Sequence, residues 1–354
     1  MKVYKDLYWL IISPARLFQA WDEFKIDKRN KVDVLQFEKN LEQNIFELYR
    51  NLKNKTYIHR GYTDFYIYDP KRRHIYKATV RDRVLHHAIF KVLNCIFEPT
   101  FISTSFSCRI DRGNHKGVDF LYKVIREVSR NYTKKCFVLK CDIRKFFDSV
   151  GHKILLDILK RKIKDTNVIW LIEEIIRSYT SDNSAFTRER ERERVGIPIG
   201  NLTSQIFANI YMNEFDQFIK HTLRIEHYAR YTDDFVIVSD NKDYLKELIP
   251  KLQLFLLEKL KLKIHPKKMT IIKYIQGIDF LGYVIFPHHL LLRAKTKKRI
   301  IRNLKLKVYN YKRGLISKNK LEQSIQSYFG VLSHANTHKL KEFLKNQIWI
   351  WLND

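Results

Sequence analysis

The sequence has few of the residues that cross-link or interrupt a chain. Its four cysteines, Cys95, Cys108, Cys136 and Cys141, show no C-x-x-C spacing, so we expect neither a structural zinc site nor a disulfide framework. Ten glycines and seven prolines are scattered, without a linker or a repeat. No run approaches the roughly 18 apolar residues that a membrane-spanning helix needs. The apolar centre of the N-terminal stretch, YWLII, is also shorter than the ~7–15 residues of a signal peptide. These absences favour a cytoplasmic globular protein with no membrane partner.

Acidic residues are scarce relative to basic ones. The 354 residues include 67 Lys and Arg against 38 Asp and Glu, a formal net charge of +29. Such an excess suggests a polyanionic partner; the alternative is a proteome with a general bias towards lysine. Apolar residues at 45% and aromatic residues at 14% exclude general disorder. The run RERERER, residues 188–194, is expected to form a solvated surface hairpin or, alternatively, a basic face for phosphates.

Basic charge is densest in residues 291–320, which hold twelve Lys or Arg and no acidic residue. Apolar residues lie between the basic ones: Ile300, Ile301, Leu304, Leu306 and Val308. We expect a helix that docks its apolar side on the body of the protein and turns its cations towards nucleic-acid phosphates, rather than a membrane-surface helix.

The order of the expected elements indicates an α+β fold. Residues 41–52 have helical spacing, and DFYIYD (64–69) alternates as a strand does. The pair His86 and His87 is expected to be an ordinary part of a helix. From residue 136 onward we expect a strand (136–143), three helices (154–163, 169–178 and 204–219), a hairpin (225–238), a helix (244–260) and short strands to 286. This order predicts a few strands covered by helices on one side.

The stretch RYTDDFVIV, residues 230–238, places two adjacent carboxylates inside an apolar run. Asp233 and Asp234 repel each other and are poor strand formers, so they add no folding stability there. At the turn of a hairpin they would be held rigidly. Hard divalent cations such as Mg²⁺ select carboxylate oxygens, and Asp142, at the end of an apolar strand, is the candidate third carboxylate. Alone the pair would more often be a plain turn; with Asp142 and the basic charge it predicts two-metal phosphoryl transfer.

These motifs resemble those of a known family. Residues 231–234, YTDD, match the Y-x-D-D box of reverse transcriptases, and Asp142 matches their first catalytic aspartate. The resemblance runs from about residue 60 to the end, with blocks in the same order. DPKRRHIYKATVRDRVLHHAI (69–89) resembles the fingers segment of the bacterial, group II intron-like branch, SFSCRIDRGNHKGV (105–118) its next block, and FLGYVIFP (280–287) the primer-grip hairpin.

The resemblance implies a right-hand polymerase fold. Residues 1–135 would be an N-terminal region and fingers, and residues 291–354 a helical thumb. Residues 136–290 would be the palm, a small antiparallel sheet backed by helices, with 164–200 partly fingers.

The block GIPIGNLTSQIFANIYMNEFD (196–216) resembles one subgroup of the family more than the others. Most relatives carry Gln-Gly and then Ser-Pro, where this chain has Ile199-Gly200 and Ser204-Gln205. This form resembles the reverse transcriptases of diversity-generating retroelements, which copy a template-repeat RNA with frequent errors opposite adenine. Ile199 would face the incoming nucleotide without an amide anchor, which should loosen the rejection of wrong pairs; its alternative role is simple palm packing. The alternative functions are a phage-defence-associated or retron-like reverse transcriptase, or an idle RNA-binding protein.

The resemblance also implies a role for each site residue. The catalytic residues would be Asp142, Asp233 and Asp234. The metal-binding positions would be Asp142, Ile143, Asp233 and Asp234, holding two Mg²⁺ ions that Mn²⁺ can replace in vitro. The nucleotide-binding positions would be Lys71, Arg73, Phe147, Ile199, Gly200, Gln205 and Lys268. Phe147 would be the steric gate against a ribose 2′-OH, and Lys267 competes with Lys268 for the place beside the leaving pyrophosphate. The primer grip would comprise Phe280, Leu281, Gly282 and Tyr283. The nucleic-acid contacts of the thumb would be Lys297, Lys298, Arg299, Arg302 and Lys305.

The implied partners are a template RNA, a primer and its cDNA, and dNTPs. An A-form hybrid would be contacted at phosphates and 2′-hydroxyls, because its deep groove cannot be read by side chains. The chain ends about 34 residues after the basic stretch, which leaves no room there for an RNase H, integrase or endonuclease domain. We therefore expect a bacterial or phage-encoded polymerase that depends on partners, including a small, basic, oligomeric accessory protein.

Overall fold

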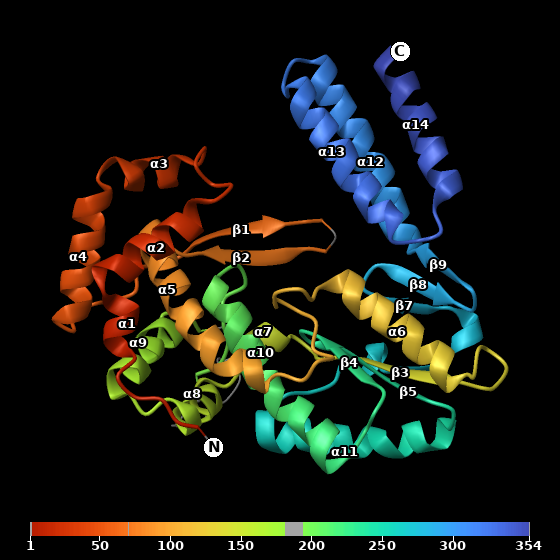
Figure 1. The fold of residues 1–354 in the computed structure, drawn as a ribbon, viewed down its shortest axis with the longest axis horizontal. Helices are drawn as coiled ribbons and strands as arrows, with labels where there is room; N and C mark the ends of the chain where they lie inside the picture. Colours follow the sequence, from red (N-terminus) through yellow and green to blue (C-terminus); the bar gives the residue numbers. More distant parts are fainter. Residues whose placement is uncertain (1, 70, 181–193, 354) are drawn as a thin grey trace.

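The structure is a computed structural model that describes residues 2–69, 71–180 and 194–353. All but the last residue of the RERERER run therefore lies outside the described residues. Figure 1 shows a helical N-terminal part from which a two-stranded hairpin projects, a central region of sheets, and a separate bundle of helices at the C-terminus. The expected α+β order is confirmed.

The N-terminal part is built around one long helix, α5 (Val80–Phe97), which is buried along most of its length. The Thr79 side chain caps its first turn by accepting the backbone N–H of Asp82. The helices around it are α1 (Tyr8–Ile12), α2 (Pro14–Lys25), α3 (Val32–Lys39) and α4 (Leu41–Lys53). Helix α4 confirms the helix expected at 41–52, because Ile45, Leu48 and Leu52 form its buried stripe.

A two-stranded hairpin leaves this helical part. Strands β1 (Thr63–Ile67) and β2 (Arg73–Lys77) pair antiparallel, so the strand expected at DFYIYD is present. Every residue of β1 is exposed, however. Its alternation therefore does not mark a buried face. In Figure 1 the hairpin extends from beside α5 towards the C-terminal bundle.

The central sheet has the strand order β4-β5-β3-β6 and is antiparallel throughout. Its strands are β3 (Phe137–Asp142), β4 (Tyr228–Tyr231), β5 (Asp234–Ser239) and β6 (Thr270–Lys273). Phe235 and Ile237 join the hydrophobic cluster formed with helices α10 (Leu202–Gln217) and α11 (Lys242–Leu260). Val236 and Val238, one residue out of phase, join a second cluster.

That second cluster corrects the expectation of helices on one side only. Helix α6 (Asn114–Val128) covers the other face together with a three-stranded sheet. The strands of this sheet are β7 (Ile278–Phe280), β8 (Tyr283–Phe286) and β9 (His289–Leu292). Both faces of the central sheet are therefore buried. This explains why β3 and β5 are nearly continuous apolar runs, because a strand with one face in water would alternate apolar and polar residues.

Shorter helices complete this region. They are η1 (Glu98–Thr100), α7 (Phe146–Ser149), α8 (His152–Lys162), α9 (Thr166–Arg177), η3 (Phe218–Thr222), η4 (Pro266–Lys268) and η5 (Tyr274–Gln276). The expected order of strand, helices, hairpin and helix between 136 and 260 is confirmed. All four cysteines are free thiols. Among the described helices, none combines the length and the apolar character needed to cross a bilayer.

The C-terminal bundle consists of α12 (Ala294–Lys312), α13 (Lys318–Ser333) and α14 (His338–Asn353). Ile300, Leu304 and Val308 of α12 pack in a cluster of the bundle's own. The expectation that the basic stretch docks on the body is therefore wrong, because its apolar stripe faces α13 and α14. Leu306 is 55% exposed, since its position falls outside that four-residue repeat.

Candidate active site

The YTDD segment forms the tight turn between β4 and β5. Tyr231 pairs with Asp234 across the two strands, which leaves Thr232 and Asp233 as a two-residue loop. Asp234 is also the cross-strand partner of Asp142 at the end of β3. The backbone N–H of Ile143 donates to the carbonyl of Asp233 at 3.2 Å. Strand pairing thus brings the three aspartates, which are distant in sequence, to one end of the sheet.

The carboxylates at this end of the sheet oppose one another's ionisation. Burial, together with the charges of Asp234 and Asp142, raises the pKa of Asp233 to about 6. Burial and the charge of Asp142 also raise the pKa of Asp234, and the charges of Lys140 and Lys71 act in the opposite direction. A cation placed among these groups would remove the cost of ionising them together.

Lys268 already supplies one positive charge to the cluster. It ends η4, and its Nζ lies 2.8 Å from Oδ2 of Asp142. The chain before it is tied to the end of β3, because the N–H of His265 donates to the carbonyl of Asp142 at 2.8 Å. Of the two lysines that compete in the sequence, Lys268 is thus the one placed on a site carboxylate. The backbone N–H of Lys267 donates to the His265 ring.

The donor chemistry of the cluster suits Mg²⁺, which prefers carboxylate oxygens and retains water ligands. Asp142 and Asp234 are within hydrogen-bond reach of each other. In residues 2–69, 71–180 and 194–353, no three His, Cys, Asp or Glu side chains are already grouped as a complete set of metal ligands. Asp142 is instead paired with Lys268.

Two cations of the β1–β2 hairpin influence the ionisation of residues in the YTDD turn. Lys71 and Arg73 are both exposed. The charge of Lys71 acts on Asp234, and that of Arg73 acts on Tyr231. The hairpin therefore contributes positive charge to the electrostatics of the YTDD turn.

The segment that carries Ile199 joins the same hairpin to the central region. The carbonyl of Ile199 accepts the N–H of Tyr76 at 2.9 Å, and Asn201 Nδ2 donates to the carbonyl of Tyr76 at 2.9 Å. Gly200 has a φ of +116°, and a Cβ there would lie 2.7 Å from Cγ2 of Ile75. Ile199 is half-buried, whereas Gln205, in the first turn of α10, is exposed.

The two phenylalanines of α7 differ in burial. Phe146 is 2% exposed and part of the core. Phe147 is half-buried and contacts Phe146 edge to face, with ring centroids 5.3 Å apart. Its carbonyl accepts the N–H of Ile197, so Phe147 lies between the aspartate strand and the Ile199 segment.

The hairpin β7–β8 turns at Leu281 and Gly282, which both have positive φ, as a two-residue hairpin loop favours. Its flanking residues, Phe280 and Tyr283, are buried in the second cluster. The Tyr283 hydroxyl lies 3.2 Å from the carbonyl of Val331 on α13. Of the four residues predicted for the primer grip, Leu281 and Gly282 at the tip are half-buried and are therefore more accessible than Phe280 and Tyr283.

The basic residues predicted on the C-terminal bundle all lie on α12. Lys297, Lys298, Arg302 and Lys305 are exposed, and Arg299 is half-buried. Arg299 and Arg302 also have a partner within the protein: both lie within ion-pair distance of Asp69 at the end of the β1–β2 hairpin.

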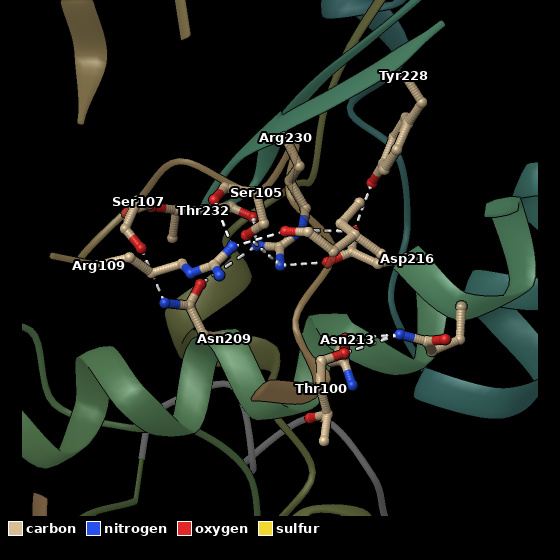
Figure 2. A network of polar contacts seen from close by, with 12 residues as sticks. Thr100, Ser105, Ser107, Arg109, Asn209, Asn213, Asp216, Tyr228, Arg230 and Thr232 are labelled. Carbon is tan, nitrogen blue, oxygen red and sulfur yellow. Dashed lines mark hydrogen bonds and ion pairs between the residues drawn. The ribbon is translucent and has the colours of Figure 1, made fainter. Parts of the chain in front are cut away.

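A buried polar network behind the YTDD turn was missed in the sequence. Figure 2 shows Arg230 of β4 between Asp216 of α10 and the turn residue Thr232, with Ser105, Ser107 and Asn209 around them. Arg230 and Asp216 are both 0% exposed. The available signal was an arginine inside the apolar strand YARY, which must find a buried partner; the sequence does not say which one.

The chain is similar to known proteins over most of this region. A family model described as reverse transcriptase (RNA-dependent DNA polymerase) matches residues 69–285, which include the three aspartates. A group II intron-encoded protein, LtrA, of Lactococcus lactis subsp. cremoris is 24% identical over 309 residues, covering 69% of this chain and 50% of the relative. Protein YkfC of Escherichia coli (strain K12) is 25% identical over 250 residues, covering 62% of each. The chain thus spans about half to three-fifths of the length of these relatives.

Solved structures with a similar chain path include two telomerases. An apo telomerase from Candida tropicalis, truncated from its C-terminal domain, gives a TM-score of 0.48 at 15% identity, covering 70% of this chain and 59% of that one. A telomerase from Candida albicans in complex with a fragment of telomeric RNA gives 0.45 at 13% identity, covering 88% and 64%.

Proposed function

The chain belongs to the reverse transcriptase family, and we propose that it is an RNA-directed DNA polymerase that makes cDNA on a template RNA by nucleotidyl transfer. Its small antiparallel sheet backed by helices is the palm of a right-hand polymerase fold. We assign the β1–β2 hairpin to the fingers and the α12–α14 bundle to the thumb. The proposed boundaries remain 1–135, 136–290 and 291–354; the separate core of the bundle supports the last of them.

The observation that carries the proposal is the convergence of Asp142, Asp233 and Asp234 at one end of the palm sheet. We propose that they hold two Mg²⁺ ions. When bound, such ions activate the attacking hydroxyl and stabilise the leaving oxygen of an in-line displacement. The raised pKa values of Asp233 and Asp234 support this assignment, because each carboxylate needs a compensating cation.

The remaining groups suit the binding of a deoxynucleotide and a duplex. Lys71 and Arg73 would bind the triphosphate, where paired cations match the charge on the transferred phosphoryl group. Phe147 would exclude a ribose 2′-hydroxyl, and Lys268 would leave Asp142 for the pyrophosphate. The exposed cations of α12 would contact phosphates of the template–primer duplex.

Primer extension on an RNA template with dNTPs and Mg²⁺ tests the proposal. Asp233→Asn keeps the size of the side chain and removes its charge, and is expected to lower incorporation by roughly a hundredfold or more. Asp240→Asn is the matched control, because Asp240 is exposed beyond the opposite end of β5. Undiminished incorporation by Asp233→Asn would contradict the assignment.

We further propose that the enzyme is of the diversity-generating retroelement type and makes errors opposite adenine. This rests on the Ile199-Gly200 and Ser204-Gln205 pairs and on the position of Ile199 beside the fingers strand β2. Sequencing cDNA made from an adenine-rich template by the wild type and by Ile199→Gln tests it. Fewer adenine-directed errors in the variant are expected, and equal error spectra would count against it. A small, basic, oligomeric accessory protein is the partner proposed with this type, and co-purification from the source cell tests that proposal.

A further inference from the structure

The turn that carries Asp233 has a backbone conformation that its sequence does not favour. Thr232, the first residue of the two-residue loop, has a φ of +57°, whereas the φ of Asp233 is negative. A two-residue hairpin with positive φ at its first position only is of type II′, which normally has glycine there. A β-branched residue with positive φ is a clear outlier, so other contacts must hold Thr232 in place.

Two side chains supply those contacts. Arg230 Nη1 donates to the carbonyl of Thr232 at 2.9 Å. The Thr232 hydroxyl lies 2.6 Å from Oγ of Ser107. The segment of Ser107 is itself anchored, because its carbonyl accepts Nδ2 of Asn209 on α10 at 2.8 Å. Thr232 is therefore held at both its carbonyl and its side chain (Figure 2).

The hydrogen bond to the Thr232 carbonyl selects between two forms of the turn. Types I′ and II′ differ mainly by a flip of the central peptide, and the carbonyl of that peptide in this loop is the one of Thr232. In the type I′ form, the φ of Asp233 would be positive and its carboxylate would be aimed differently. Holding this carbonyl thus fixes the direction of Asp233.

Arg230 is rigid enough for this task. Its guanidinium forms a two-point ion pair with Asp216, from Nε to Oδ1 at 2.8 Å and from Nη2 to Oδ2 at 2.6 Å. Nη2 also donates to Oγ of Ser105 at 3.1 Å, and the Tyr228 hydroxyl donates to Asp216 at 2.7 Å. A planar guanidinium with two fixed bonds presents its remaining N–H in one direction. Stability alone does not explain the ion pair of Arg230 and Asp216, because apolar residues of similar volume often stabilise a core as well as a buried ion pair does.

We propose that Arg230 and Ser107 are positioning residues, which hold the strained Thr232 peptide in the type II′ form so that Asp233 points at the metal site. This inference rests on the proposed polymerase function. Neither residue is assigned contact with substrate. Both act through Thr232, and Asp216 acts through Arg230.

The test compares two buried serines. Ser107→Ala removes the hydroxyl that contacts Thr232, whereas the control Ser105→Ala removes one that contacts only the guanidinium in this network. Residues that orient metal ligands typically change metal affinity by about 10- to 100-fold when mutated. We expect Ser107→Ala to weaken Mg²⁺ binding in calorimetric titration by about tenfold, to lower kcat, and to leave KM for template–primer unchanged. Ser105→Ala leaves the hydroxyl contact of Thr232 and both bonds from Arg230 to Asp216 in place, so it should shift Mg²⁺ binding less than Ser107→Ala does.

Arg230→Lys is the second variant, because lysine keeps a charge for Asp216 but loses the fixed fork. Arg230→Lys is expected to weaken Mg²⁺ binding at least as much as Ser107→Ala does. Both variants are measured at a temperature where circular dichroism shows that each is folded. If both serine variants shift Tm equally and neither shifts Mg²⁺ binding, the network is merely structural and the inference is overturned. Asp233→Asn is the reference: if it also binds Mg²⁺ like the wild type, the metal site fails instead.

Discussion

Asp69, at the end of the fingers hairpin, lies 3.3 Å from Arg302 and 3.7 Å from Arg299 of the thumb helix α12. Asn303 Nδ2 of the same helix donates to Asp69 at 3.1 Å. The far end of the β1–β2 hairpin thus contacts helix α12, and Figure 1 shows the hairpin extending towards the C-terminal bundle. Two arginines predicted to bind phosphates are here paired with a carboxylate, which a duplex bound as proposed would have to displace.

Asp69→Asn is therefore expected to tighten the binding of template–primer. The ion pairs of Asp69 are partly exposed, and such pairs contribute up to about 1 kcal/mol. Removing this competition is therefore expected to lower the Kd for template–primer by roughly two- to fivefold at low salt. The gain should shrink as salt is added, because exposed charges are screened. Fluorescence anisotropy measures it. Asp64→Asn is the control, since Asp64 pairs with His74 within the hairpin; equal effects of the two variants would refute the competition.

Lys268→Met should make the palm more dependent on Mg²⁺. Without the ammonium group, Asp142 loses its 2.8 Å partner and the carboxylate cluster loses a cation. We expect a lower Tm in EDTA than for the wild type and a larger rise in Tm on adding Mg²⁺, because the ions then neutralise more uncompensated charge. Differential scanning fluorimetry measures both. Lys267→Met is the control and should behave as the wild type does. If Lys268→Met also behaves as the wild type does, Lys268 does not stabilise the cluster.

The histidines of α5 make stability depend on pH. His86 is 1% exposed, and its Nε2 lies 3.2 Å from Nε2 of His59. Burial lowers the pKa of both, and lowers that of His87 to about 4. Because these values lie below the unfolded value of about 6.5, the folded state binds fewer protons. The stability that neutral histidines confer is complete above about pH 6.5 and is lost as the pH falls towards 4.

The corresponding measurement is the urea midpoint between about pH 7 and pH 5. His86→Gln should flatten the fall of the midpoint with decreasing pH, whatever its effect at pH 7. His338→Gln, at the exposed start of α14, should leave the slope unchanged. A slope in His86→Gln as steep as in the wild type would mean that the buried pair does not account for the loss.

Gly200→Ala should disturb the junction between β2 and the Ile199 segment. The φ of +116° is unfavourable for alanine, and its Cβ would meet Cγ2 of Ile75 at 2.7 Å. A loss of about 1–3 kcal/mol in the free energy of unfolding is expected, measured by urea denaturation. Ile75→Ala in the same chain should restore part of it by removing the clash. Gly330→Ala is the control: nothing lies within 4 Å of its Cβ in α13, so it should stabilise by up to about 1 kcal/mol. Equal losses in both glycine variants would exclude the steric explanation.

Local pattern was sufficient to predict the hairpin that carries Asp233 and Asp234. Apolar residues on both sides of Asp233 and Asp234 define two strands, and a turn between them follows. The antiparallel register then brings Asp142 opposite Asp234. The hairpin needs only neighbours in sequence, whereas the pairing of β3 with β5 joins distant segments and was expected from the resemblance to the family.

The errors and omissions concern contacts between distant segments. The periodicity of α12 correctly marked Ile300, Leu304 and Val308 as buried, but a periodic stripe does not identify the helix that it packs against. Arg230 was not recognised, because a charged residue in an apolar strand has many conceivable partners and its partner Asp216 lies on another element. The contact between Asp69 and Arg302 spans 233 positions, which no local rule covers.

The exposure of every residue in β1 has a mechanical consequence. The outer strand of this ribbon packs on no hydrophobic layer, whereas β2 is half-buried and is tied to the Ile199 segment through Tyr76. Bending of the ribbon is therefore expected near its far end rather than at its root, while the central sheet, buried on both faces, keeps its shape. One molecule thus combines a pliable arm with a rigid platform.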